Sequence, residues 1–103
     1  EIDVGISGRT AQKVSEKMAV TGRGHQVICI THLAQIAAMA DAHYVIEKTV
    51  AAGKTRTGIR LLAEDEATEE LARILGGAEI TDTVRENARE MKKLAENYKK
   101  IKV

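Results

Sequence analysis

The residue with the clearest chemical potential is a histidine at the end of an apolar run. Val27 to Ile30 is rich in strand-forming residues, and Thr31-His32 follows before the pattern turns helical. In open α/β sheets, ligands bind at the carboxyl ends of the strands, which would give His32 a ligand to face. Thr31 could equally cap the following helix and leave His32 as part of a simple connection. Position alone leaves both interpretations open.

Other candidate sites are weak. Gly5-Ile6-Ser7-Gly8 approaches the G-x-S-x-G pattern of serine hydrolases, but that pattern requires glycine where Arg9 stands, so we reject this class. The one cysteine, Cys29, lies in the apolar run and is expected in the core. The chain contains no G-x-x-x-x-G-K-[ST] loop, so it is not expected to cradle a triphosphate by itself.

A metal site is also disfavoured. The chain has three histidines, and none of them stands four residues from another. His25 and His43 precede expected strands, whereas His32 follows one, so the side chains would lie at opposite ends of a sheet. Zinc needs its ligands in one place. We therefore predict no metal site within this chain.

The elements that must position these residues follow from periodicity. Apolar residues at helical spacing predict helices over about 9–21, from 33 to about 41, from 64 to Gly76-Gly77, and from 81 or 82 to Lys100. Strands are expected over 26–31, 43–50 and 56–63. The last two are separated by the polar segment 51–55, which predicts an antiparallel hairpin with a loop longer than two residues.

This order predicts an α/β fold with a small mixed sheet of about three strands. The strands at 26–31 and 43–50 would form a parallel pair joined through the short helix, and the hairpin would add an antiparallel strand. Helices would flank the sheet. With 103 residues, the chain is expected to form one domain at most, and its opening at Glu1 suggests a cut inside a larger one.

Composition narrows the class of protein. The chain has no Phe or Trp, so its core must be built from small aliphatic residues. The net charge of +1 gives no general attraction to nucleic acid or to an anionic membrane. No apolar run approaches the ~20 residues that span a bilayer, and no signal peptide is visible. With a single cysteine, these features predict a cytoplasmic protein.

Helix 82–100 carries a stripe that could serve packing or binding. Val84, Ala88, Met91, Ala95 and Tyr98 step by four and three, like the seam of a coiled coil. The stripe either docks on the rest of the domain or binds a partner helix. Positive charge near the end of this helix stabilises the negative end of the helix dipole. The same charge is also a candidate DNA contact. It comes from five lysines: Lys92, Lys93, Lys99, Lys100 and Lys102.

Three stretches together carry a resemblance to a known family. These are EIDVGISGRTAQKVSEKMA, HQVICITHLAQIAAMADAHYVIEK and LARILGGAEITDTVRENAREM, which occur in order and cover nearly the whole chain. They resemble the C-terminal part of the ATPase head of the RecN family of bacterial DNA repair proteins, which are related to SMC proteins and ABC ATPases. The resemblance implies that residues 1–103 are the C-terminal segment of a P-loop ATPase head, with the phosphate loop and the Walker B strand upstream.

The resemblance assigns roles to particular residues. Glu1 matches the catalytic glutamate that polarises the attacking water, and His32 matches the switch histidine near the terminal phosphate. Asp3, Val4, Gly5, Ile6, Ser7 and Gly8 match the D-loop, which faces a second head across the nucleotide. Ile6-Ser7 stands where SMC heads carry Leu-Asp, a departure that fits the RecN branch. Thr31-His32 would end the strand because a phosphate is expected there.

The implied activity is ATP hydrolysis in double-strand break repair and recombination, with ATP and Mg²⁺ bound by the parent protein. The isolated chain is expected to be inactive and to bind neither. The implied partners are a second ATPase head in a homodimer, DNA through the parent protein, and recombination proteins, with no membrane. The location would be the bacterial cytoplasm, at the nucleoid. Two alternatives stay open: a non-catalytic interaction module that uses the 82–100 seam, and the head of another SMC or ABC branch.

Overall fold

In the part of the chain that the structure describes, four helices form the body and one hairpin projects from it. The computed structural model describes Gly5 and residues 8–103. The elements in chain order are α1 (Gly8–Thr21), α2 (Ala34–Ala38), β1 (Tyr44–Ala51), β2 (Lys54–Leu61), α3 (Glu64–Gly76) and α4 (Asp82–Lys102). All four predicted helices are present. The class, helices with strands, is as predicted.

Local signals explain the helix ends. Thr81 Oγ1 accepts the N–H of Val84 at 3.2 Å and caps α4. The Glu66 carboxylate accepts the N–H of Ala63 at 3.0 Å, so an acidic first turn satisfies a donor at the start of α3. The Gly77 N–H reaches the Arg73 carbonyl as α3 ends. A Cβ added to Gly76 would lie 3.1 Å from Val84 Cγ1, so this glycine lets the end of α3 lie close to α4.

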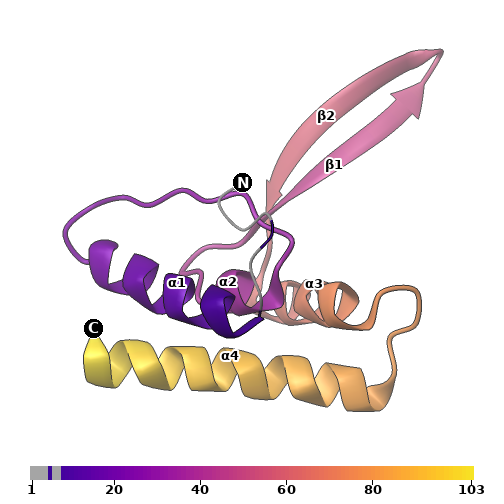
Figure 1. Ribbon diagram of the computed structural model, residues 1–103. Helices are drawn as coiled ribbons and strands as arrows, with labels where there is room; N and C mark the ends of the chain where they lie inside the picture. Colours follow the sequence, from indigo (N-terminus) through magenta and orange to yellow (C-terminus); the bar gives the residue numbers. More distant parts are fainter. Residues whose placement is uncertain (1–4, 6–7) are drawn as a thin grey trace.

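The core lies where α2 meets the other helices. Figure 1 shows α3 and α4 running antiparallel, with α1 and α2 above α4. The buried cluster consists of six alanines and two larger residues: Ala34, Ala37, Ala38, Met39, Leu71, Ala72, Ala88 and Ala95. Alanine allows helices to approach closely, which compensates for the missing large aromatic residues. The seam of α4 therefore docks within the domain, since Ala88 and Ala95 are buried and Val84, Met91 and Tyr98 pack against the cluster.

Lys99 fixes the far end of α4 to α2. Its Nζ donates to the Met39 carbonyl at 3.2 Å and to Asp41 Oδ1 at 2.9 Å. Nearer the middle of α4, Lys92 Nζ lies 3.5 Å from Glu64 Oε1. Two of the five lysines of the basic end thus make contacts within the domain, and their side chains are only 14 and 21% exposed.

The predicted three-stranded sheet is wrong. Within the described residues the sheet has two strands, β1 and β2, paired antiparallel, and the expected parallel pair is absent. Residues 26–31 form no strand, and Val27, Ile28 and Ile30 are 40, 84 and 60% exposed. A strand exists only when a neighbouring strand pairs with it, whereas the apolar pattern shows only that a residue suits one. Residues 26–31 thus have the propensity for a strand but no pairing strand among the described residues.

The hairpin loop is shorter than predicted. β1 ends at Ala51 and β2 begins at Lys54, so only Ala52 and Gly53 connect them, with Ala51 opposite Lys54. Both loop residues have positive φ, 52° and 75°. This combination is typical of the type I′ turn, whose twist matches that of paired strands. Alanine is unusual in the first position of such a turn, which Ala52 occupies. For this reason the sequence of segment 51–55 predicted a longer loop.

Replacing Ala52 by asparagine should stabilise the hairpin. Alanine in the left-handed region costs about 1 kcal/mol, whereas asparagine tolerates it and Asn-Gly is the preferred type I′ pair. We expect Ala52→Asn to slow amide hydrogen exchange in β1 and β2 several-fold. Ala51→Asn is the matched control, because Ala51 is a strand residue and should gain nothing. Equal effects of the two substitutions would rule out the turn as the cause.

Candidate functional site

The predicted D-loop is described only at its two glycines. Glu1, Asp3, Val4, Ile6 and Ser7 lie outside the described residues. Gly5 is exposed in a turn with φ of 79°, a conformation that glycine adopts without strain. Gly8 begins α1. The site prediction for the opening stretch therefore remains a prediction, apart from the position of these two residues.

Gly8 lies against the helix that follows His32. A Cβ added to Gly8 would stand 3.1 Å from Gln35 Nε2, and Gln35 belongs to α2. This close approach joins the start of α1 to α2. The fold thus brings the last residue of the predicted D-loop next to the short helix that begins two residues after His32.

His32 is exposed and lies in the connection before α2. Thr31 Oγ1 accepts the N–H of Leu33 at 3.0 Å, across His32, so the threonine forms a local turn and does not cap α2. Ala34 and Ile36, just beyond, are 5% exposed and anchor the segment in the core. An exposed imidazole with an anchored backbone on one side is suited to contact a ligand that approaches from solvent.

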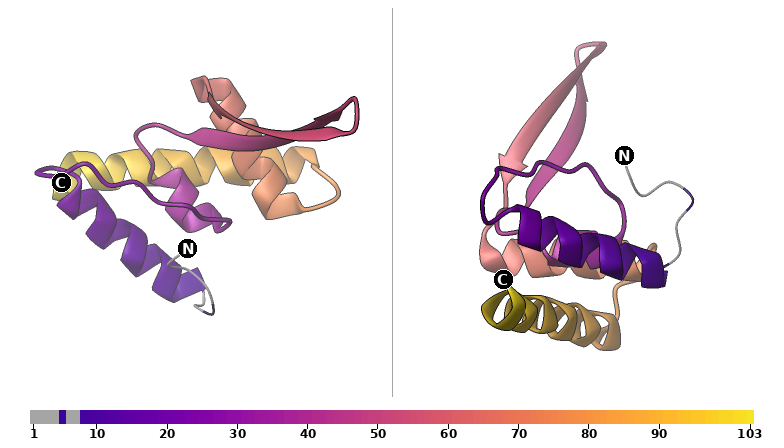
Figure 2. Two further views of the ribbon diagram at one scale, coloured as in Figure 1. Left: turned by 90° about the horizontal axis from the view of Figure 1, so that it is seen from above. Right: turned by 60° about the vertical axis from the view of Figure 1, so that its left-hand side comes forward.

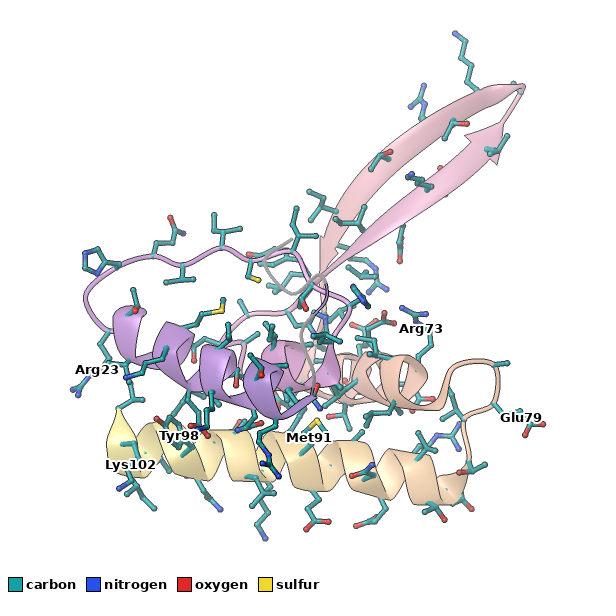
Figure 3. The ribbon with its side chains drawn as sticks, in the orientation of Figure 1. Arg23, Arg73, Glu79, Met91, Tyr98 and Lys102 are labelled. Atoms are coloured by element: carbon teal, nitrogen blue, oxygen red, sulfur yellow. The ribbon has the colours of Figure 1, made fainter. Side chains whose placement is uncertain are left out.

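A groove opens beside Gly8, between α1, α2 and α4. Its volume is about 440 Å³. The described lining residues are mainly amide and apolar: Gln12, Gln35, Ala38, Met39, Asn87, Met91, Leu94 and Ala95. Glu90 is the only ionisable one among them. Figure 3 shows Met91 between α4 and the helices above it. The described part of this groove thus offers one carboxylate, that of Glu90, among amide and apolar groups.

A second hollow, of about 270 Å³, lies between the base of the hairpin and α3. Four carboxylates line it, and each is paired with an arginine: Glu47 and Glu66 with Arg60, Glu69 with Arg85, and Glu70 with Arg73. Hydrogen bonds from the Ala63 N–H and from Arg60 lower the pKa of Glu66, and the bonds of Arg60 to Glu66 and Glu47 raise the pKa of the guanidinium. These pairs form a structural network that connects the hairpin to α3.

His43 is half-buried at the start of the hairpin. Burial lowers the pKa of its imidazole, the carboxylate of Glu70 opposes this shift, and the nearby Lys92 adds to it. The His43 carbonyl accepts the N–H of Leu62 at 2.9 Å, which closes the base of the hairpin. This histidine belongs to the structure of the hairpin base.

The described part of the chain shows neither a metal cluster nor a membrane span. Among Gly5 and residues 8–103, no three His, Cys, Asp or Glu side chains are grouped as metal ligands would be. Within the same residues, no helix has both the length and the apolar character needed to cross a bilayer.

The charge of the hairpin was missed by sequence reasoning. Lys48, Lys54 and Arg56 lie in its outer half, and no acidic residue occurs from 48 to 57. The signal was available as a local run of one charge sign. The near-zero net charge of the whole chain and the larger group of lysines near the end of α4 obscure it.

Comparison with known proteins identifies close relatives. No family model matches the chain. It is 44% identical, over 96% of its length, to the DNA repair protein RecN of Halalkalibacterium halodurans, and 43% identical over 96% to that of Bacillus subtilis. The RecN protein of Deinococcus radiodurans is 45% identical over 88%. The chain spans less than a fifth of the length of these relatives, 18, 17 and 16% respectively.

The lowered pKa of His43 predicts a loss of stability in acid. The unperturbed imidazole titrates near 6.5, and the folded state holds the neutral form below that value. The contribution is complete above 6.5 and is lost as the pH falls through the folded pKa, since folding then has to expel a proton. We expect the chain to melt at lower temperature at pH about 5 than at pH about 7.

Substitution of His43 should remove part of this pH dependence. His43→Gln is expected to flatten the difference between the two melting temperatures. His25→Gln is the matched control, because His25 is exposed in a turn and should leave the difference unchanged. If both variants keep the full pH dependence, another group is responsible.

Proposed function

Because the chain belongs to the RecN family, we propose that it is the C-terminal segment of the ATPase head of a bacterial DNA repair protein. The observation that carries the proposal is the identity of 43 to 44% to two RecN proteins over nearly the whole of this chain. The chain would contribute to ATP hydrolysis where two heads meet in a homodimer. DNA and recombination proteins would be partners of the whole protein, in the cytoplasm at the nucleoid.

In this proposal, Glu1 and His32 serve the same reaction in different ways. Glu1 orients the attacking water and accepts its proton, and His32 donates a hydrogen bond to a phosphate oxygen of ATP. Phosphoryl transfer depends mainly on positioning and on neutralising charge, so these two groups suffice as the contribution of this segment. Asp3 to Gly8 would contact the nucleotide site of the second head.

The position of α2 supports this assignment. His32 precedes α2, and Gly8 lies against Gln35 of the same helix. A short helix that is buried on most sides can hold two segments distant in sequence in a constant relation, which catalysis requires of its groups. The exposure of His32 leaves the imidazole accessible to a nucleotide bound by the rest of the head.

Magnesium would be held by residues outside this chain. When bound, the ion would neutralise charge on the phosphates of ATP. The residues of this chain would position water and donate hydrogen bonds around that substrate.

The alternatives are less well supported. An interaction module built on the α4 seam would need the seam to be available, yet Ala88 and Ala95 are fully packed inside the domain. A head of another SMC or ABC branch would not account for the identity to RecN proteins or for the Ile6-Ser7 pair. The RecN assignment explains both the opening stretch and His32.

The proposal is tested by two substitutions in the full-length protein. Glu1→Gln keeps the size and hydrogen bonding of the side chain but removes the general base, so ATP should bind while turnover falls about 10²- to 10⁴-fold. ATP-bound heads should then accumulate as dimers. His32→Ala should lower turnover without this accumulation, because it removes a contact to the phosphate. Single-turnover hydrolysis and ATP-dependent dimerisation are measured for both.

Matched controls separate these effects from general damage. Glu79→Gln and His25→Ala make the same chemical changes at exposed positions outside the proposed site, and both should hydrolyse ATP like the parent protein. Parental turnover in Glu1→Gln would overturn the assignment of the opening stretch. Parental turnover in His32→Ala would remove only the role of the histidine.

A further inference from the structure

The outer half of the hairpin carries concentrated positive charge. Residues 48–57 contain three cations, Lys48, Lys54 and Arg56, together with three threonines and no acidic residue. All ten residues are exposed. The whole chain has a net charge of +1, so the remainder is net acidic and the hairpin is the most basic projecting element. Concentrated charge of this kind produces local attraction to a polyanion even when the total charge is small.

These cations are not neutralised within the described part of the chain. Lys48, Lys54 and Arg56 form no salt bridge there. Arg60, at the base of the same hairpin, differs, because it is paired with both Glu47 and Glu66. The acidic residues of the hairpin region are thus paired at its base, and within the described residues the three cations of the outer half have no salt-bridge partner.

The shape of the hairpin suits the wide groove of a nucleic-acid duplex. Figure 1 and the right-hand view of Figure 2 show β1 and β2 rising away from the helices, so both faces of the outer half are accessible. The turn at Ala52-Gly53 is only two residues long, which makes the tip narrow. A two-stranded β-ribbon of this kind fits the major groove of B-form DNA.

The strand register distributes the cations over both faces. Lys54 and Arg56 are two residues apart on one face, a spacing of about 6.6 Å. This is about twice the axial spacing of 3.4 Å between charges along one DNA strand, so both can follow a single backbone. Lys48, opposite Thr57, lies on the other face and can contact a second backbone.

We propose that residues 48–57 are a contact site for the phosphate backbone of duplex DNA. Lys48, Lys54 and Arg56 neutralise phosphates, and the neighbouring threonine hydroxyls donate hydrogen bonds to phosphate oxygens. Contacts of this kind position a protein on DNA without reading its sequence. The inference rests on the proposed function, in which the parent protein acts on DNA, and it adds the element that touches the duplex.

The test compares two triple variants of the full-length protein. Lys48→Gln, Lys54→Gln and Arg56→Gln are combined in one variant, and Lys93→Gln, Lys100→Gln and Lys102→Gln in the other. The second set removes the same charge from exposed positions on α4. Binding to a fluorescent duplex of mixed sequence is measured by anisotropy over a series of salt concentrations. The slope of log affinity against log salt reports the number of phosphates neutralised.

The expected results differ between the variants. The hairpin variant should bind duplex DNA more weakly, with a salt slope reduced by about 3, one for each lost phosphate contact. The α4 variant should keep the parental slope, and ATP hydrolysis without DNA should be unchanged in both. Replacing Lys48 and Lys54 by arginine should preserve affinity and slope, which separates loss of charge from damage to the hairpin.

Each remaining outcome overturns the inference. If the hairpin variant keeps the parental slope while the parent binds DNA, the contact site is elsewhere and the proposed ATPase function is unaffected. If the α4 variant alone loses slope, the basic helix end is the DNA site. If the parent protein does not bind duplex DNA, both this inference and the DNA-directed part of the proposed function are wrong.

Discussion

The structure depends on the burial of α2, a helix of only five residues. Ala34, Ala37 and Ala38 are almost fully buried between α1, α3 and α4, and a helix this short has little stability of its own. It therefore exists because its neighbours pack around it. Small side chains make this possible, since each larger residue would separate the helices. The buried α2 in turn holds the two segments that flank it in sequence. These are the connection that contains His32, before it, and the hairpin, after it.

The hairpin is held at its base and is exposed beyond it. Arg60 joins it to Glu66 at the start of α3, and the His43 carbonyl closes its first rung with Leu62. Exposed ion pairs stabilise little individually, and a two-stranded ribbon alone is marginal in water. The base therefore gains its order from α3, whereas the outer half relies on its strand register and on the turn at Ala52-Gly53. Such an element suits contact with a large partner.

The segment 26–31 shows the difference between propensity and structure. Its Val and Ile residues suit a strand, but a strand also needs backbone hydrogen bonds to a neighbour, and the one described sheet contains only β1 and β2. Val27, Ile28 and Ile30 are consequently exposed. The same limitation applies to the candidate site. His32 and the D-loop glycines were identified by type and resemblance, and the close approach of Gly8 to Gln35 follows only from the packing of α1 on α2.

The sequence by itself determined the four helices, the antiparallel hairpin and the family, because periodicity, capping residues and motifs are local properties. It also indicated the docking stripe of α4, although it left open what the stripe would contact. Only the tertiary structure decided that this contact is internal and that Lys92 and Lys99 are used to hold α4. It also decided that Arg60 is paired at the base of the hairpin, whereas Lys48, Lys54 and Arg56 form no salt bridge within the described residues. These are relations between segments distant in sequence, and they arise from packing, which no local pattern specifies.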